Sequence, residues 1–234
     1  MAVRAPEDEG ISWNENLVKP LKYAIDDFIL RHSDTLDTTK IYIGGFSLGG
    51  EMTFNMCSAY PDMFAAAFPI CPHIKLNNSD ARRFAAIPVW LVSGRNDAVV
   101  SYSQMTLRNW KAVCNTTLAA ESCRFSTLDG VREPDGSRAP NQHHSWIAVT
   151  NDMFSSSDGD YPNMTTVNGL GETVELTYPN GMISWLSEFS SEYSAEDTDI
   201  SDTGSANRSL TLFQILKAVF MRIYIPLRNI TRAR

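Results

Sequence analysis

The sequence predicts an α/β fold in which helices flank a parallel β-sheet. Three observations lead to this class. Short runs rich in β-branched and aromatic residues are typical of buried strands, and segments with helical periodicity separate them. The composition is that of an ordinary globular domain, with 43% hydrophobic and 20% charged residues in a chain of 234. Because parallel strands need long crossover connections, alternating strands and helices indicate a parallel sheet.

The first predicted elements follow in the order helix, strand, helix. An amphipathic helix is expected over residues 16–30, where apolar residues recur at helical spacing. Residues 41–43 predict a buried strand that ends at the Gly44-Gly45 pair. A second helix is expected over residues 48–60, because a proline follows. This strand-to-helix connection is short and rich in glycine.

The alternation continues through the middle of the chain. Three more buried strands are expected, over residues 64–70, 89–92 and 123–128. Ser101 and Gln104 form a capping box that opens a helix reaching residue 113. Residues 154–184 are polar and rich in glycine, which predicts an excursion with a hairpin, and a helix over 182–193 closes the domain.

We divide the chain into an α/β domain at residues 1–193, a flexible acidic linker at 194–209 and a basic tail at 210–234. The linker has acids and almost no large apolar residues. After Asp202 the chain has six basic residues and no acid, and an apolar face runs from Leu212 to Ile223. This pattern predicts an amphipathic helix in peripheral contact with an anionic membrane. A helix docked on the domain or on a partner is the alternative.

The net charge and the cysteine spacings argue against a nucleic-acid-binding or zinc-binding protein. The formal net charge of -7 does not favour nucleic acid. The cysteine spacings match no zinc pattern, so no metal is expected; Cys57 and Cys71 are predicted core residues, and Cys114 and Cys123 are expected to pair under oxidising conditions. With no secretory signal or membrane span in the sequence, we expect a cytoplasmic or peripheral membrane protein. The sequence does not indicate the oligomeric state.

The segment 45–49 has the pattern G-x-S-x-G between a predicted strand and a predicted helix. Small residues around Ser47 allow a sharp turn that projects its hydroxyl from the carboxyl edge of the sheet, which makes Ser47 a candidate nucleophile. An idle serine in a glycine-rich turn is the alternative. Such a nucleophile needs an acid and then a histidine later in the chain. Asp97 follows a predicted strand at the same edge, with Asn96 and Asp62 as weaker candidates.

The histidines narrow the choice of general base. Only His143 and His144 follow Asp97, whereas His32 and His73 precede it. Both candidates lie in a polar loop after the strand predicted at residues 123–128. Chain order therefore selects this pair, and a surface histidine pair without a role is the alternative.

Three stretches resemble the α/β-hydrolase superfamily, and more narrowly its bacterial esterases and prolyl-oligopeptidase-like hydrolases: KIYIGGFSLGGEM, PVWLVSGRNDAVV and HHSW. On this resemblance the nucleophile falls on Ser47, the acid on Asp97 and the general base on His143, with His144 as the fallback. The resemblance covers roughly residues 10–150 and the closing helix.

The resemblance implies a carboxylesterase-type serine hydrolase that cleaves a small-molecule ester through an acyl-enzyme, with no cofactor. The backbone N–H of Leu48 would supply one oxyanion donor, and Trp146, Phe46 and Tyr102 are candidates to shape a pocket. In the family several strands and an oxyanion loop precede the nucleophile, whereas 46 residues and at most a strand stub at 2–4 precede Ser47 here. We therefore expect a chain that is short at its N-terminus, with no evident second oxyanion donor.

Three other functions stay open at this point. The first is a peptidase of the prolyl-oligopeptidase type, which would use the same residues on an amide bond. The second is a truncated hydrolase with impaired catalysis, because loss of one oxyanion donor costs about 100- to 1000-fold in turnover. The third is a protein without catalysis that binds membrane surfaces through its basic tail.

Overall fold

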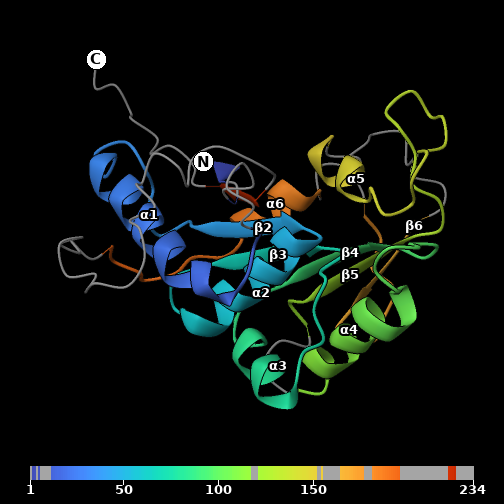
Figure 1. The fold of residues 1–234 in the computed structure, drawn as a ribbon, viewed down its shortest axis with the longest axis horizontal. Helices are drawn as coiled ribbons and strands as arrows, with labels where there is room; N and C mark the ends of the chain where they lie inside the picture. The colour runs from blue at the N-terminus through green and yellow to red at the C-terminus, as the bar shows by residue number, and fades with distance from the viewer. Residues whose placement is uncertain are drawn as a thin grey trace.

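The computed structural model describes residues 2–3, 5, 12–116, 121–151, 154, 164–176, 181–195 and 221–224. Within these residues the chain builds a seven-stranded sheet in the order β1-β7-β2-β3-β4-β5-β6, with helices on both faces (Figure 1). The central strands are parallel: β2 (Tyr42–Phe46), β3 (Ala66–Ile70), β4 (Trp90–Gly94) and β5 (Arg124–Leu128). The predicted class, an α/β-hydrolase-like parallel sheet flanked by helices, is confirmed.

Antiparallel strands complete both sides of the sheet. β6 (Met164–Asn168) pairs with β5, and β7 (Met221–Tyr224) pairs with β2. The strand stub at the N-terminus is present as β1 (Ala2–Val3), which pairs with β7. β6 belongs to the segment predicted as an excursion, so its hairpin extends the sheet instead of leaving it.

The prediction of a helix between Leu212 and Ile223 is wrong at residues 221–224. These residues form β7, in which Ile223 lies opposite Ile43 of β2. A tertiary contact overrides the local periodicity here, because pairing with β2 satisfies the backbone hydrogen-bonding groups along the edge of β2. The other residues of the predicted tail, and residues 196–209 of the predicted linker, lie outside the described residues.

Helices connect the parallel strands and cover the sheet. Their bounds are α1 (Val18–Arg31), α2 (Leu48–Ala59), α3 (Asn78–Phe84), α4 (Leu107–Cys114), α5 (Trp146–Thr150) and α6 (Met182–Ser187). A 3-10 turn precedes α1 and a π-helical turn precedes α4, where the Ser101 hydroxyl accepts the N–H of Gln104 as the capping box predicts. The closing helix α6 ends at Ser187, earlier than predicted, and the short helices α3 and α5 were not predicted.

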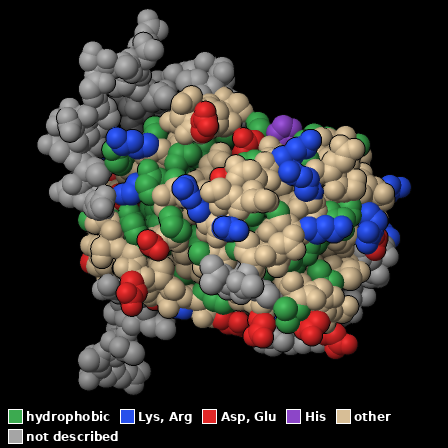
Figure 2. Space-filling view, turned by 90° about the horizontal axis from the view of Figure 1, so that it is seen from below, with side chains coloured by type: hydrophobic (Ala, Val, Ile, Leu, Met, Phe, Trp, Pro, Cys, Tyr) green, Lys and Arg blue, Asp and Glu red, His purple; other side chains and the backbone are tan. Residues whose placement is uncertain are grey.

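The sheet separates two hydrophobic cores. Side chains alternate between the faces of a strand, so Ile43 and Leu91 pack against α1 to α4, while Tyr42 and Trp90 pack against α5 and α6. Figure 1 shows α2, α3 and α4 on one side of the sheet and α5 and α6 on the other. On the face seen in Figure 2, Lys and Arg side chains are scattered among apolar and neutral ones, and acidic side chains gather at one edge.

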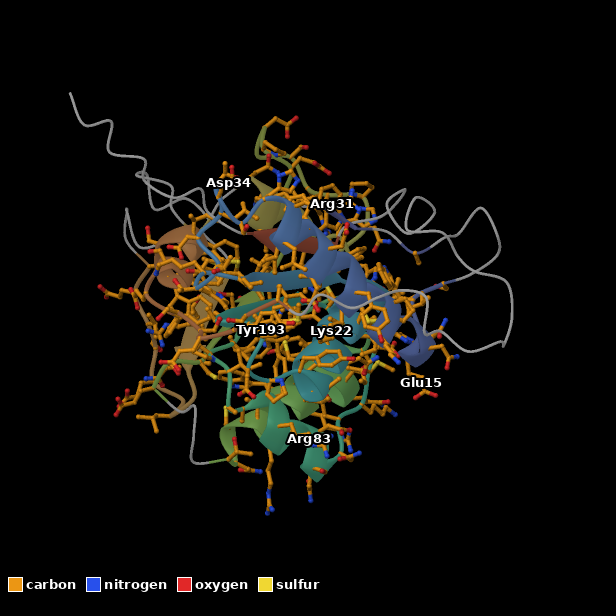
Figure 3. The ribbon with its side chains drawn as sticks, turned by 90° about the vertical axis from the view of Figure 1, so that its left-hand side faces the viewer. Glu15, Lys22, Arg31, Asp34, Arg83 and Tyr193 are labelled. Atoms are coloured by element: carbon orange, nitrogen blue, oxygen red, sulfur yellow. The ribbon has the colours of Figure 1, made fainter. Side chains whose placement is uncertain are left out.

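A buried charged cluster binds the segment after α6 to α1 (Figure 3). Lys22 Nζ lies 2.6 Å from Asp26 Oδ2, and the Tyr193 hydroxyl donates to Asp26 Oδ1 at 2.6 Å. Burial, together with the hydrogen bond to Asp26, raises the pKa of Tyr193 to about 12. The cluster therefore fastens the chain at residue 193 to the first helix.

The structure shows whether a helix could span a membrane and how the four cysteines are placed. Among the described residues, no helix combines the length and the apolar character needed to cross a bilayer. Cys57 and Cys71 are buried, as predicted for core residues. Cys114 and Cys123 are free thiols in this structure, so their pairing under oxidising conditions stays a prediction.

Candidate active site

The carboxyl ends of three adjacent parallel strands bring the candidate residues to one edge of the sheet. Ser47 follows β2, and Asp97 lies in the turn after β4. Between them, Cys71 follows β3 and donates its N–H to the carbonyl oxygen of Val92 in β4 at 2.9 Å. His143 belongs to the loop between β5 and α5. Ligand sites of α/β sheets occupy this edge.

Ser47 adopts a strained backbone conformation. Its φ of 55° and ψ of -114° lie outside the regions that residues with a side chain prefer, at a cost of about 1–3 kcal/mol. Three hydrogen bonds hold it there: its N–H donates to Ile70 at 2.9 Å, and its carbonyl oxygen accepts from Glu51 at 3.0 Å and from His73 at 3.2 Å. The turn is thus fixed by β3 and by the first turn of α2.

The glycines around Ser47 are required by close backbone contacts. A Cβ on Gly45 would lie 2.3 Å from the carbonyl oxygen of Gly49. A Cβ on Gly50 would lie 2.9 Å from Pro72 Cα and 3.0 Å from the carbonyl oxygen of Ile70. All three distances are shorter than ordinary Cβ contacts, so the glycines let α2 start immediately after β2 and pack against the end of β3.

Asp97 and His143 form a buried hydrogen-bonded pair. Nδ1 of His143 lies 2.7 Å from Oδ2 of Asp97. The exposed fraction is 6% for His143 and 8% for Asp97. The other oxygen of Asp97 accepts the N–H groups of Val99 at 2.8 Å and Val100 at 2.9 Å. Burial alone raises the pKa of Asp97, but the hydrogen bonds from His143, Val100 and Val99 outweigh it and hold that pKa below its ordinary value.

The ring of Phe46, the residue before Ser47, packs against the histidine loop. Its centroid is 4.5 Å from that of the His143 ring. Since Asp97 occupies Nδ1 of His143, Nε2 is the ring nitrogen available to another group. The described hydrogen bonds include none between Ser47 Oγ and His143, and in unliganded enzymes such bonds are often long and tighten when substrate binds.

None of the alternative candidates takes part in the hydrogen bond between Asp97 and His143. His144 is half-buried against aromatic rings, with centroid distances of 6.1 Å to Trp146 and 6.4 Å to Phe46, and no carboxylate contacts it within the described residues. Asn96 and Asp62 are exposed.

Other large side chains border the candidate residues or pack away from them. Tyr102 stacks on Phe125 with the ring centroids 5.9 Å apart and shares a hydrogen bond with Thr127 at 3.0 Å, so it belongs to the packing of the domain. Leu48 and Val99, which lie within two residues of Ser47 and Asp97, are exposed. They place apolar surface close to these candidates.

The heteroatoms of Cys71, Asp97 and His143 lie within 4.8 Å of one another, which raises the question of a metal site. Two ligands of one tetrahedral zinc ion are separated by more than 3 Å, given bond lengths of about 2.0–2.3 Å, whereas Asp97 and His143 are 2.7 Å apart. Zinc also binds thiolate, and burial raises the pKa of the Cys71 thiol well above its ordinary value. The residues fit a hydrogen-bonded network better than a metal site.

Several residues at this edge were not singled out as site residues from the sequence. Cys71 was predicted only as core, although its position after a predicted strand was a usable signal. Ser145 is fully buried beside it, and no feature of the sequence indicated this. Oε2 of Glu51 lies 3.8 Å from Nδ1 of His73, next to Ser47. Burial raises the pKa of Glu51, and the interaction with His73 partly offsets that rise.

The fold and this edge of the sheet define an α/β-hydrolase-like domain. No protein-family model matches the chain. Over 78 residues the chain is 33% identical to a bifunctional acetylxylan esterase/xylanase, XynS20E, from Neocallimastix patriciarum. The matched segment covers 32% of this chain and 11% of that protein. The chain therefore spans only a small part of the curated relative that it matches.

Two solved structures are also similar to the chain. A thermostable esterase has 26% sequence identity and a TM-score of 0.49, over 74% of this chain and 37% of that one. A SOBER1 variant from Arabidopsis thaliana has 18% identity and a TM-score of 0.41, over 57% of this chain and 61% of that one.

Proposed function

We propose that the protein is a serine hydrolase that cleaves carboxylic esters with Ser47 as nucleophile, His143 as general base and Asp97 as the residue that orients the histidine. The observation that carries this proposal is the buried Asp97–His143 pair at the sheet edge where Ser47 is held in its strained turn. A strained serine between a strand and a helix is typical of the nucleophile elbow, and the chain order Ser, Asp, His is that of α/β-hydrolases.

The reaction follows from these positions. Nε2 of His143 takes the proton of the Ser47 hydroxyl while Oγ attacks the acyl carbonyl, and Asp97 stabilises the imidazolium that forms. The same proton then passes to the departing alcohol as the carbon–oxygen bond breaks, which leaves Ser47 acylated. Water, deprotonated by His143, attacks the acyl-enzyme and releases the carboxylic acid, after which Ser47 regains its proton.

The start of α2 supplies stabilisation for the negative charge that develops on the carbonyl oxygen. Leu48 is the first residue of α2, and the first N–H groups of a helix have no partner within it. Its N–H and the positive end of the helix dipole favour an anion at this point. We therefore assign one oxyanion donor to Leu48, as the sequence predicts.

An ester is the substrate class that we favour over a peptide. The partial sequence similarity to an acetylxylan esterase/xylanase supports an ester, and the exposed side chains of Leu48 and Val99 offer apolar surface next to the candidate residues. Peptide cleavage by the same three residues, and impaired catalysis, are the competing outcomes of the test.

The test is hydrolysis of p-nitrophenyl acetate and of a peptide p-nitroanilide by purified protein, compared with Ser47→Ala. We expect turnover of the ester only, and its loss in Ser47→Ala by about four orders of magnitude or more. Ser79→Ala, on α3, is the matched control and should retain wild-type turnover. Cleavage of the anilide, with or without the ester, would establish the peptidase, and equal rates for wild type and Ser47→Ala would refute the proposal.

A further inference from the structure

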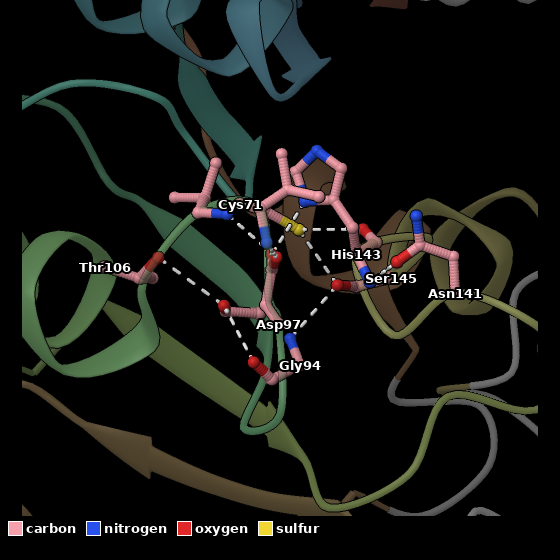
Figure 4. Close-up of polar contacts among 10 residues, drawn as sticks. Cys71, Gly94, Asp97, Thr106, Asn141, His143 and Ser145 are labelled. Atoms are coloured by element: carbon pink, nitrogen blue, oxygen red, sulfur yellow. Dashed lines mark hydrogen bonds and ion pairs between the residues drawn. The ribbon is translucent and has the colours of Figure 1, made fainter.

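The hydroxyl of Ser145 joins the histidine loop to two strands of the sheet (Figure 4). Ser145 lies two residues after His143 and is fully buried. Its Oγ accepts the N–H of Gly94, the last residue of β4, at 3.0 Å. The same Oγ lies 2.9 Å from the Sγ of Cys71, the residue directly after β3. Since a buried hydroxyl is stable only with its partners in place, these contacts define where the loop sits.

The hydrogen bonds around Ser145 run in one direction. The Cys71 thiol donates to the carbonyl oxygen of His143 at 3.3 Å, so the hydroxyl is the donor in the contact between Ser145 and Cys71. Burial keeps the proton on the sulfur by raising the pKa of Cys71. A chain of hydrogen bonds thus leads from the N–H of Gly94 through Ser145 and Cys71 to the backbone of His143.

Gly94 links both members of the Asp97–His143 pair. Its N–H binds Ser145 in the histidine loop, and its carbonyl oxygen accepts the N–H of Asp97 at 3.3 Å. A Cβ on Gly94 would lie 2.5 Å from the carbonyl oxygen of Gln142. Glycine at this position therefore lets the histidine loop approach the end of β4.

His143 is held by its backbone as well as by its ring. Its N–H donates to Asn141 Oδ1 at 2.9 Å, and its carbonyl oxygen accepts the N–H of Ser145 at 2.8 Å in addition to the Cys71 thiol. With Nδ1 bound to Asp97, Nε2 is the polar atom of His143 for which the described contacts include no hydrogen bond.

We propose that Ser145, acting through Cys71 and Gly94, is a positioning residue that sets the place of His143 against Asp97. This inference rests on the proposed function, because positioning matters only if His143 takes a proton during turnover. A shift of about 1 Å in a catalytic group lowers the rate by about 100-fold. The hydroxyl of Ser145 touches no reacting atom, so its effect falls on kcat and not on substrate binding.

A purely structural role for Ser145 is the competing interpretation, and Ser126 offers a matched control. Ser126 is also fully buried, and its hydroxyl also has two partners, Trp90 Nε1 at 2.8 Å and Thr166 Oγ1 at 2.7 Å. It lies on β5 among packing residues. Ser126→Ala therefore removes an equivalent buried hydroxyl without touching the histidine loop.

The experiment compares Ser145→Ala and Ser126→Ala in the full chain by ester hydrolysis, urea unfolding and one-dimensional proton NMR. Both variants should be destabilised. Only Ser145→Ala should lose kcat, by about 10- to 100-fold with KM within about 2-fold of wild type. It should also shift or broaden the far-downfield resonance of the proton between His143 and Asp97, which Ser126→Ala should preserve.

Substitutions at Cys71 give a second, independent comparison. Cys71→Ser keeps a donor and an acceptor at the same place and should retain most of kcat and the downfield resonance, whereas Cys71→Ala should behave like Ser145→Ala. If Ser145→Ala and Cys71→Ala match Ser126→Ala in kcat and in the NMR spectrum, the positioning role is refuted. If wild type hydrolyses no ester, the proposed function fails, and the NMR comparison still decides whether Ser145 positions His143.

Discussion

The carboxylate of Asp97 lies 2.7 Å from Nδ1 of His143, although 46 positions separate the two residues in the chain. The contact forms because β4 ends where the loop after β5 returns to the same edge of the sheet. Both side chains are buried, and the lowered pKa of Asp97 keeps the carboxylate charged at neutral pH. A carboxylate at this distance fixes the tautomer of the imidazole.

Replacement of this carboxylate tests its role. Asp97→Asn keeps the shape of the side chain but no longer enforces the tautomer of His143, so we expect kcat for an ester to fall by about 10⁴-fold with little change in KM. Steady-state kinetics on the purified variant measure this. Asp62→Asn, which changes an exposed carboxylate, should keep wild-type kinetics. An Asp97→Asn enzyme with more than a tenth of wild-type kcat would remove Asp97 from the mechanism.

The two neighbouring histidines should differ sharply in their effects. His143→Ala should abolish ester hydrolysis, because the pair with Asp97 is lost. His144→Ala should retain most activity, because His144 contacts the rings of Trp146 and Phe46 instead of a carboxylate. Initial rates of ester hydrolysis for the two variants decide this, and the reverse pattern would make His144 the general base.

The elements with strong local signals were predicted from the sequence, and those that depend on distant partners were not. The turn at Ser47 is encoded locally by Gly45 and Gly50, so its place in the fold could be predicted. α3 was missed because it is short and polar, although Asn77 caps its first turn. β7 was predicted as a helix because its pairing with β2 is a long-range contact that periodicity does not reveal.

In the candidate site, too, local signals could be read from the sequence and contacts between distant residues could not. The sequence order Ser, Asp, His was enough to select Asp97 and His143 as candidates. It did not distinguish His143 from His144 without a resemblance, and the structure separates them by the single contact with Asp97. Ser145 had no signal at all, since its role depends on the ends of β3 and β4 meeting the histidine loop.

The buried cluster on α1 predicts a dependence of stability on alkaline pH. The folded protein raises the pKa of Tyr193 to about 12, above the value of about 10 in an unfolded chain. The neutral phenol therefore stabilises the fold fully below about pH 10, and this contribution is lost as the pH rises through the folded value.

Tyr193→Phe should unfold at lower urea concentration than wild type at pH 8, since a hydrogen bond to a buried carboxylate contributes about 1.5–3 kcal/mol. The difference in the free energy of unfolding should shrink between pH 10 and pH 12. Urea unfolding at several pH values measures this difference, with Tyr23→Phe on α1 as a control for tyrosine titration in general. A difference that stays constant over this range would contradict the assignment.

Truncation tests the strand at the C-terminal end. Deleting residues 205–234 removes β7 and leaves β2 without that partner, which should lower the free energy of unfolding, because the backbone groups along that edge of β2 lose their hydrogen bonds. Hydrolysis of a small soluble ester per folded molecule should stay unchanged. If stability is unaffected and sedimentation with anionic vesicles is lost instead, the tail acts at a membrane and the pairing of β7 contributes nothing.

The nucleophile is the central claim, and active-site labelling tests it most directly. A fluorophosphonate reacts with an activated serine and leaves a phosphonyl group on its oxygen, which peptide mass spectrometry locates. We expect one modified residue, Ser47, with no labelling of Ser47→Ala and strongly reduced labelling of His143→Ala. Labelling at another serine, or unchanged labelling of Ser47→Ala, would contradict the assignment of Ser47 as the nucleophile.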